Sequence, residues 1–280
     1  MTNKNSRPIK KVLESVAGIF INPFSQLQPS TAVGYPTSPH DLITLPTGLR
    51  LLDKALGIGG LPAGIITELM SPGDSTASSG AVNIAARIAS NVQRKQQLVT
   101  IIDLSHNFDS WQAERCGLIA PQLLLNRPDT LFEALAALEV AAHREGLIVV
   151  IFGCTTSLLS QASPNLRGAL LGRLRNIVRS STTTFLFLTT AQTNNPFNPQ
   201  NYPTGFPLAE LADIRLWIQD ETWTHKDGMA TAYKANITVI KNNLAIAGRG
   251  ADLRVKFSNP ASDASEALET SFGRRTQQQT

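Results

Sequence analysis

The sequence predicts an α/β fold in which a mainly parallel sheet, flanked by helices, continues into an antiparallel extension. Short apolar runs rich in β-branched residues alternate with helical patterns from about residue 64 to 190. Near-continuous apolar strands of this kind are typical of a parallel sheet covered on both faces. After a long Asn/Pro-rich stretch at 193–207, three strand-like runs follow without helices between them, which indicates a meander.

The expected elements follow one another along the chain. Apolar residues spaced three or four apart mark the helices, and unbroken apolar runs mark the strands. In chain order these are a strand at 64–70, a helix through 84–92, a strand at 98–103, a helix through 131–138, a strand at 147–152, a helix through 170–177 and a strand at 183–190. The antiparallel extension comprises IRLWIQD, ANITVIKN and LRVKF.

Composition divides the chain into three parts. Residues 1–42 are expected to hold a short helix around Ile9 to Ala17 and a linker rich in Ser, Thr and Pro. Residues 43–257 are expected to form the core. Residues 258–280 are polar and rich in small side chains, so we expect a disordered tail.

The charge of the chain is compatible with a polyanionic partner. The formal net charge is +4 and the pI about 9.2, and basic residues gather at 167–179 and 241–256. Solvated faces explain such clusters equally well, because charged residues make up only 16% of the chain. Net charge alone therefore does not identify a nucleic-acid binder.

Location and cysteine chemistry can also be anticipated. No apolar run reaches the roughly 20 residues of a membrane span, and the apolar stretch before Pro23 is too short for a signal peptide. We therefore expect a cytoplasmic protein without membrane contact. Cys116 and Cys154 lie among apolar residues, so both are expected to be buried small side chains, and none of the four histidines, His106 included, is expected to bind a metal.

A long motif begins at Leu45, where LPTGLRLLDKALGIGGLPAGIITELMSP resembles the start of the RecA/RadA recombinase core. The matching residues are Thr47, Gly48, Leu52, Asp53, Ala55, Leu56, Gly57, Gly59, Gly60, Leu61, Pro62, Gly64, Glu68 and Pro72. The likeness continues at 101–118 through Asp103, His106, Asp109 and Gly117, and extends in strand order to about Phe257. It implies the RecA core fold, self-association or docking onto a recombinase filament, and DNA contact through two loops.

The likeness fails at the phosphate-binding loop, or Walker A motif. A working loop follows G-x-x-x-x-G-K-[ST], but here Ser71 and Thr76 replace the two glycines and Ala77 replaces the lysine, while Ser78 retains the magnesium-binding hydroxyl. Taken without the resemblance, this loop is an ordinary turn into a helix. Losing the lysine and adding Cβ atoms at the glycines should weaken ATP binding by at least about tenfold.

Hydrolysis is also expected to be absent. The resemblance places the glutamate that activates the attacking water at Ser105, and a hydroxyl is no base at neutral pH. It places the Walker B aspartate at the end of the strand at 147–152, where Phe152 and Gly153 stand. We expect a pseudo-ATPase with no catalytic residue and no cofactor, although weak binding of ATP with magnesium stays open.

Two residues of the family's ATP-sensing machinery are retained. Gln192 stands where the family links its nucleotide site to a DNA loop. Lys241 matches one of two lysines that reach a neighbour's nucleotide, whereas Asn243 replaces the other. A partial set of this kind again indicates that ATP sensing is lost.

The stretch after Gln192 carries the strongest candidates for DNA contact. Phe197, Tyr202 and Phe206 lie among polar and flexible residues, and aromatic rings in such a loop can stack on unpaired bases. The alternative is a surface loop whose rings pack back on the sheet. The family's other DNA loop, near 159–165, looks short and uncharged.

Arginines on the helix after that short loop offer a substitute for it. Arg167, Arg173 and Arg175 could follow the phosphates of a DNA strand. A helix in this position otherwise packs one face on the core and exposes the other to water.

Three functions stay open from the sequence. The first is a non-hydrolysing RecA-like protein of DNA repair, recombination or the SOS damage response that binds single-stranded DNA, a RecA filament or a translesion polymerase. It resembles in layout the ImuA-type accessory proteins of translesion synthesis, whose phosphate loop is also degenerate. The second is a protein-only adaptor of the same machinery, and the third is a divergent DNA-dependent ATPase that uses Lys241.

Overall fold

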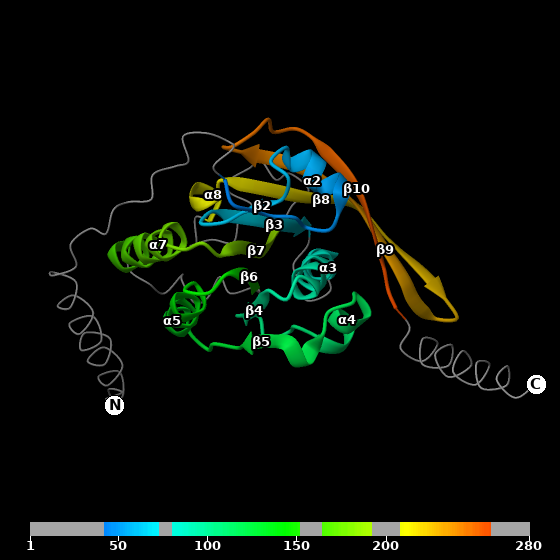
Figure 1. Ribbon diagram of the computed structural model, residues 1–280, viewed down its shortest axis with the longest axis horizontal. Helices are drawn as coiled ribbons and strands as arrows, with labels where there is room; N and C mark the ends of the chain where they lie inside the picture. Colours follow the sequence, from blue (N-terminus) through cyan, green and yellow to red (C-terminus); the bar gives the residue numbers. More distant parts are fainter. Residues whose placement is uncertain (1–41, 73–79, 152–163, 192–207, 259–280) are drawn as a thin grey trace, which may run out of the picture. The chain divides into compact units, whose positions relative to one another are not determined.

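The sheet of this protein places β3 between two strands that come much later in the chain. The computed structural model describes residues 42–72, 80–151, 164–191 and 208–258. Within these residues eight strands form one sheet in the order β10-β9-β8-β3-β7-β6-β4-β5 (Figure 1). Their bounds are β3 (Ile66–Pro72), β4 (Leu98–Asp103), β5 (Leu123–Asn126), β6 (Gly146–Ile151), β7 (Thr184–Ala191), β8 (Ile214–Lys226), β9 (Met229–Asn242) and β10 (Gly250–Lys256).

The sheet is parallel from β8 to β5 and antiparallel beyond β8. β3 pairs in parallel with β7 and β8, and β4, β5, β6 and β7 continue the parallel pairing. β9 pairs antiparallel with β8 and with β10. The structure therefore confirms the expected mainly parallel sheet with a C-terminal antiparallel extension.

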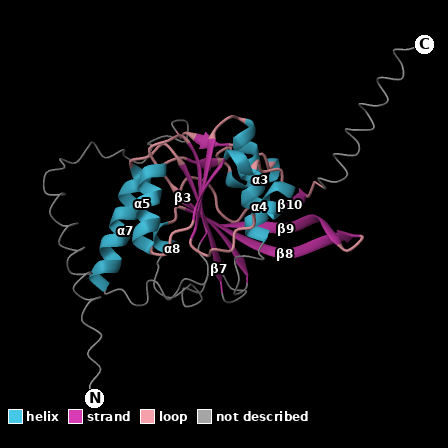
Figure 2. Ribbon diagram, turned by 90° about the horizontal axis from the view of Figure 1, so that it is seen from below, coloured by secondary structure: helices cyan, strands magenta, loops and turns pink. Residues whose placement is uncertain are grey.

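Helices cover both faces of the sheet, as Figure 2 shows. On one face lie α3 (Gly80–Arg94) and α4 (Ser110–Arg115), and on the other α5 (Leu131–Ala141), α7 (Pro164–Arg179) and α8 (Leu208–Leu211). Successive strand residues serve opposite faces, so Ile101 packs with the residues of α3 and Ile102 with those of α5. This two-sided burial explains why the central strands are apolar without interruption.

Smaller elements surround this core. α2 (Arg50–Leu56) packs against β9 and β10, β1 (Thr44–Leu45) pairs antiparallel with β2 (Leu61–Pro62), and η3 (Ala120–Gln122) precedes β5. β5, α8 and the outer part of the β8–β9 hairpin were not expected from the sequence. The expected N-terminal helix, the linker and the tail lie outside the described residues, so their boundaries stay predictions.

The matched motif fixes both ends of α2. Thr47 donates to Asp53 Oδ1 from its hydroxyl at 2.7 Å and from its N–H at 3.0 Å, which holds the chain entering the helix. Gly57 ends the helix in the left-handed region at φ 75°, where glycine carries no Cβ penalty. These motif residues therefore specify local backbone geometry.

Candidate functional site

The edge formed by the carboxyl ends of the parallel strands is where ligands bind in open α/β sheets. Pro72, Asp103, Ile151 and Ala191 end the described strands β3, β4, β6 and β7 at this edge. Of the expected phosphate-loop residues, only Ser71 falls among the described residues. Thr76, Ala77 and Ser78 lie outside them.

Ser71 lies inside the sheet near the end of β3. It pairs with Thr190 of β7 in the parallel register, and its side chain is fully buried. Among the described residues, its hydroxyl has no hydrogen-bond partner. The first residue of the expected phosphate loop is therefore a strand residue with a side chain, where the family motif has a glycine.

Ser105, at the position of the expected catalytic glutamate, is engaged by a neighbouring carboxylate. Its hydroxyl donates to Asp103 Oδ1 at 2.5 Å and its N–H donates to the same oxygen at 3.1 Å. Asp103 is fully buried, and its Oδ2 accepts from the Phe108 N–H at 2.9 Å and from Arg127 Nε at 3.3 Å. The Asp103 carboxylate thus organises the turn after β4, and the Ser105 hydroxyl belongs to that arrangement.

Arg127 and His106 border the same turn. Arg127 also donates to the Phe108 carbonyl at 2.7 Å. His106 has a left-handed backbone at φ 57°, and its Nε2 lies 3.1 Å from the Pro128 carbonyl and 3.7 Å from Asp129 Oδ1. Within the described ranges, no group of three or more His, Cys, Asp or Glu side chains could hold a metal ion.

Lys241 and Asn243 both contact their own chain near the end of β9. Lys241 Nζ donates to the Ala209 carbonyl of α8 at 3.2 Å. The Asn243 side-chain amide donates to Asp213 Oδ1 at 2.8 Å. In this arrangement the Lys241 ammonium joins the end of β9 to α8.

The three candidate arginines differ in their surroundings. Arg173 on α7 forms an ion pair with Glu139 on α5, so it joins two helices on the same face of the sheet. Arg175 is exposed. Arg167 lies on α7, but its side chain is outside the described part, as are Gln192, Phe197, Tyr202 and Phe206.

A buried ion pair was not foreseen from the sequence. Glu68 of β3 and Arg215 of β8 lie opposite each other in the parallel register, with side chains only 2% and 9% exposed. Arg215 Nε donates to Glu68 Oε2 at 2.6 Å, and the Thr189 hydroxyl of β7 donates to Glu68 Oε1 at 2.8 Å. The sequence does hold one signal for this ion pair, because Glu68 and Arg215 each interrupt an apolar run.

An aromatic cluster joining α4 to the β8–β9 hairpin was also not foreseen. The Arg115 guanidinium carbon lies 5.1 Å from the centroid of the Trp111 ring and 5.3 Å from that of Phe257. Trp223 of β8 stacks on Phe257 with centroids 5.9 Å apart. Trp111 is nonetheless 55% exposed, so the protein presents an aromatic side chain to its surroundings.

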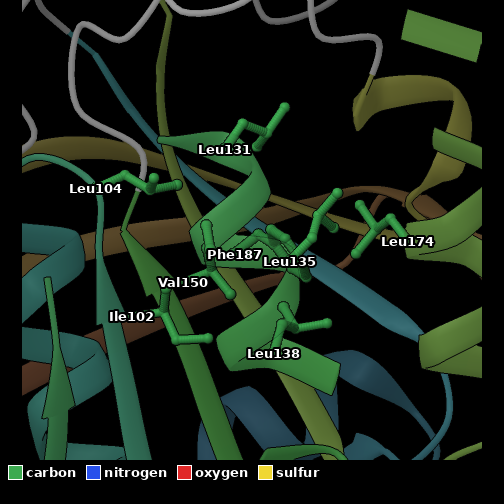
Figure 3. Close-up of a pocket in the computed structure, with 9 residues that line it drawn as sticks. Ile102, Leu104, Leu131, Leu135, Leu138, Val150, Leu174 and Phe187 are labelled. Atoms are coloured by element: carbon green, nitrogen blue, oxygen red, sulfur yellow. The ribbon is translucent and has the colours of Figure 1, made fainter. Parts of the chain in front are cut away.

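The crevice under α5 is apolar. Figure 3 shows leucines of α5 directed toward Ile102, Val150 and Phe187 of the sheet. Its lining residues are Ile102, Leu104, Leu131, Ala134, Leu135, Leu138, Val150, Leu174 and Phe187. Because this space has hardly more room than one water molecule and almost no polar lining, it is a feature of core packing and no ligand site.

None of the helices in the described part of the chain is both long enough and apolar enough to span a membrane. Cys116 is buried as expected, with 1% of its surface exposed, whereas Cys154 falls outside the described residues. Burial raises the pKa of the Cys116 thiol to about 12, against the opposing effect of Arg87 and Arg115.

The sheet order, with helices on both faces and an antiparallel extension after β8, defines an α/β protein of the RecA-like class. The chain belongs to the family described as the RecA N-terminal domain, whose model matches residues 32–262.

Several curated RecA proteins resemble the chain. Protein RecA of Thermus thermophilus is 29% identical over 230 residues, covering 76% of this chain and 66% of that protein. Protein RecA of Ruminococcus albus is 25% identical over 246 residues, covering 82% of this chain and 61% of that protein. The chain thus spans less than two thirds of the length of these two relatives.

Proposed function

We propose that this chain is a DNA-repair or recombination protein that works without ATP hydrolysis and binds single-stranded DNA. Membership of the RecA N-terminal domain family supports the repair role. The observation that carries the non-hydrolysing part is the 2.5 Å hydrogen bond from Ser105 to the buried Asp103. A hydroxyl that donates to a carboxylate and replaces the expected glutamate offers no base for a water molecule.

Lys241 gives the competing ATPase hypothesis little support. That hypothesis requires a cation supplied to a neighbour's nucleotide, and Lys241 Nζ instead donates to the Ala209 carbonyl of its own chain. A Lys241 ammonium used in this way would have to leave its present acceptor before it reached another subunit.

A protein-only adaptor is the second candidate, and Trp111 favours it. An exposed tryptophan held by an adjacent arginine is the kind of side chain that dominates protein interfaces. Partners of this kind would be a RecA filament, a translesion polymerase or another copy of the chain.

Fluorescence anisotropy of a labelled single-stranded oligonucleotide separates these functions. We expect binding that weakens steeply between about 50 and 200 mM salt, because bound phosphates release counterions, and that does not change when Mg-ATP is added. Phe197→Ala with Tyr202→Ala should weaken binding by at least about 30-fold, because each lost stack costs roughly 1–3 kcal/mol and the two together cost at least about 2 kcal/mol. Trp111→Ala, an exposed aromatic outside 193–207, is the matched control and should bind normally.

Each contrary result points to one alternative. An absence of binding at either salt concentration would refute DNA binding and leave the adaptor. Phosphate release from Mg-ATP that disappears in Lys241→Ala would refute the non-hydrolysing proposal.

A further inference from the structure

A carboxylate from the β8–β9 hairpin is bound at the start of α3. Glu221 Oε1 accepts the N–H of Gly80, the first described residue of α3, at 3.2 Å. The same oxygen accepts the Tyr233 hydroxyl of β9 at 2.5 Å. Both strands of the hairpin and a residue 141 positions before Glu221 therefore meet through one carboxylate oxygen.

A β-bulge directs Glu221 to this position. Along β8 the pairing steps from Gln219 to Thr222, while along β9 it steps only from Asn236 to Lys234, so β8 holds one extra residue here. Asp220, inside the bulge, has a left-handed backbone at φ 50°. A bulge changes the direction of the side chains next to it. The strained backbone of Asp220 directly precedes Glu221, whose side chain contacts α3.

Tyr233 and Gly80 fit each other closely. Tyr233 is fully buried, and a Cβ atom at position 80 would overlap its hydroxyl. Burial raises the pKa of the Tyr233 hydroxyl, and the hydrogen bond to Glu221 raises it further. The phenol therefore stays protonated and continues to donate to the carboxylate.

The start of α3 is also where the family resemblance places the phosphates of a nucleotide. The first N–H groups of a helix and its dipole favour a negative charge. We propose that the Glu221 carboxylate is an internal anion, which takes the place of a bound phosphate at the start of α3. It thereby excludes external phosphates from the start of this helix. The inference rests on the proposed nucleotide-independent function and assigns a residue to it.

The hydrogen bonds of Glu221 to Gly80 and Tyr233, here called the hairpin anchor, have a direct mechanical consequence. Because Glu221 belongs to β8 and Tyr233 to β9, both strands of the hairpin are held to α3 by groups of the chain itself. The hairpin then keeps its position relative to α3 whether or not nucleotide is present.

Thermal unfolding of the full chain tests this assignment. Glu221→Gln keeps the size of the side chain and removes its charge, and Tyr233→Phe removes one donor. Asp227→Asn, an exposed acid at the tip of the same hairpin, is the matched control for lost charge. We expect Glu221→Gln to lower Tm by about 2–6 °C relative to Asp227→Asn, with a smaller loss for Tyr233→Phe.

Inorganic pyrophosphate is the probe for exclusion. At about 10 mM it should raise the Tm of Glu221→Gln by about 2 °C more than that of the wild type or of Asp227→Asn, since a ligand stabilises the state that binds it. Equal Tm values for Glu221→Gln and Asp227→Asn would overturn the anchor. An equal pyrophosphate response in all proteins would overturn the exclusion.

A phosphate-release assay with Mg-ATP on the wild type separates the two proposals. Release of phosphate would refute the proposed function, whereas the pyrophosphate comparison alone decides the role of Glu221.

Discussion

Arg215 Nε donates to Glu68 Oε2 at 2.6 Å in the interior of the sheet, where β8 pairs with β3. The Thr189 hydroxyl of β7 contacts the other carboxylate oxygen, and an Arg215 nitrogen lies 2.9 Å from Met70 Sδ. The strands on both sides of β3 thus contribute a polar group to one buried cluster. Its geometry ties β3 to β7 and β8 at one register.

Removing either partner of this pair should destabilise the protein strongly. We expect Glu68→Ala and Arg215→Ala each to lower the free energy of unfolding by about 3–5 kcal/mol, because a buried charge loses its counter-charge. The paired variant Glu68→Leu with Arg215→Met should lose less than either single variant. Urea unfolding measures these differences, with the exposed Glu210→Ala as control. Single variants as stable as this control would contradict the buried pair.

Ser105 should matter for stability and have no role in catalysis. We expect Ser105→Ala to lower the free energy of unfolding by about 1–2 kcal/mol, since Asp103 loses a hydrogen-bond donor. Ser110→Ala, at an exposed serine, should cost little. Phosphate release should be at background in the wild type and both variants, and a signal that only Ser105→Ala abolishes would show that Ser105 is catalytic.

The parallel strands could be predicted because burial on both faces produces unbroken apolar runs. β5 was missed since this four-residue edge strand, Leu123–Asn126, is largely exposed on the described surface, and its apolar run is too short to indicate a strand. The outer part of the hairpin was missed because its residues, such as Thr222 and Thr224, are polar and exposed. Its turn at Asp227–Gly228 does match a common hairpin signal.

The candidate site residues were predicted from a family motif and from local residue patterns, and neither source describes contacts made in three dimensions. A family motif marks the positions of Ser71 and Ser105. The burial of Ser71 depends on the pairing of β3 with the distant strand β7, whereas the partner of Ser105 is Asp103, two residues earlier. The contact of Glu221 depends on a bulge and on Gly80, which is 141 residues away. No local pattern in the sequence records such a contact.

Substitution of Arg173 should affect stability, whereas substitution of Arg175 should affect DNA binding. Arg173→Ala removes the ion pair to Glu139, so we expect it to lower stability and to leave the salt dependence of DNA binding unchanged. Arg175 is exposed, and Arg175→Ala should weaken binding at low salt and reduce the slope of log affinity against log salt by about one. Anisotropy at several salt concentrations measures both, and identical slopes would remove Arg175 from the DNA contact.

The thiol of Cys116 should make stability depend on pH under alkaline conditions. Its pKa rises from the ordinary value of 9.0 to about 12 in the folded chain. The unfolded chain therefore loses this proton first, so the contribution of the thiol to stability is complete below pH 9 and is lost as the pH rises through 12. Above pH 9 the free energy of unfolding should fall by up to about 1.4 kcal/mol per pH unit from this group alone.

Cys116→Ala isolates that contribution. The variant loses some packing at every pH, since the Sγ atom is buried beside Asn83, but its stability should fall less steeply than that of the wild type between about pH 9 and 12. Urea unfolding in the presence of a reductant, at several pH values, gives the two slopes. In a Cys154→Ala background, iodoacetamide at about pH 8 should modify Cys116 only after urea is added, because the folded thiol is both buried and protonated. Rapid modification of the folded protein would mean that Cys116 is accessible and that its pKa is near the ordinary value.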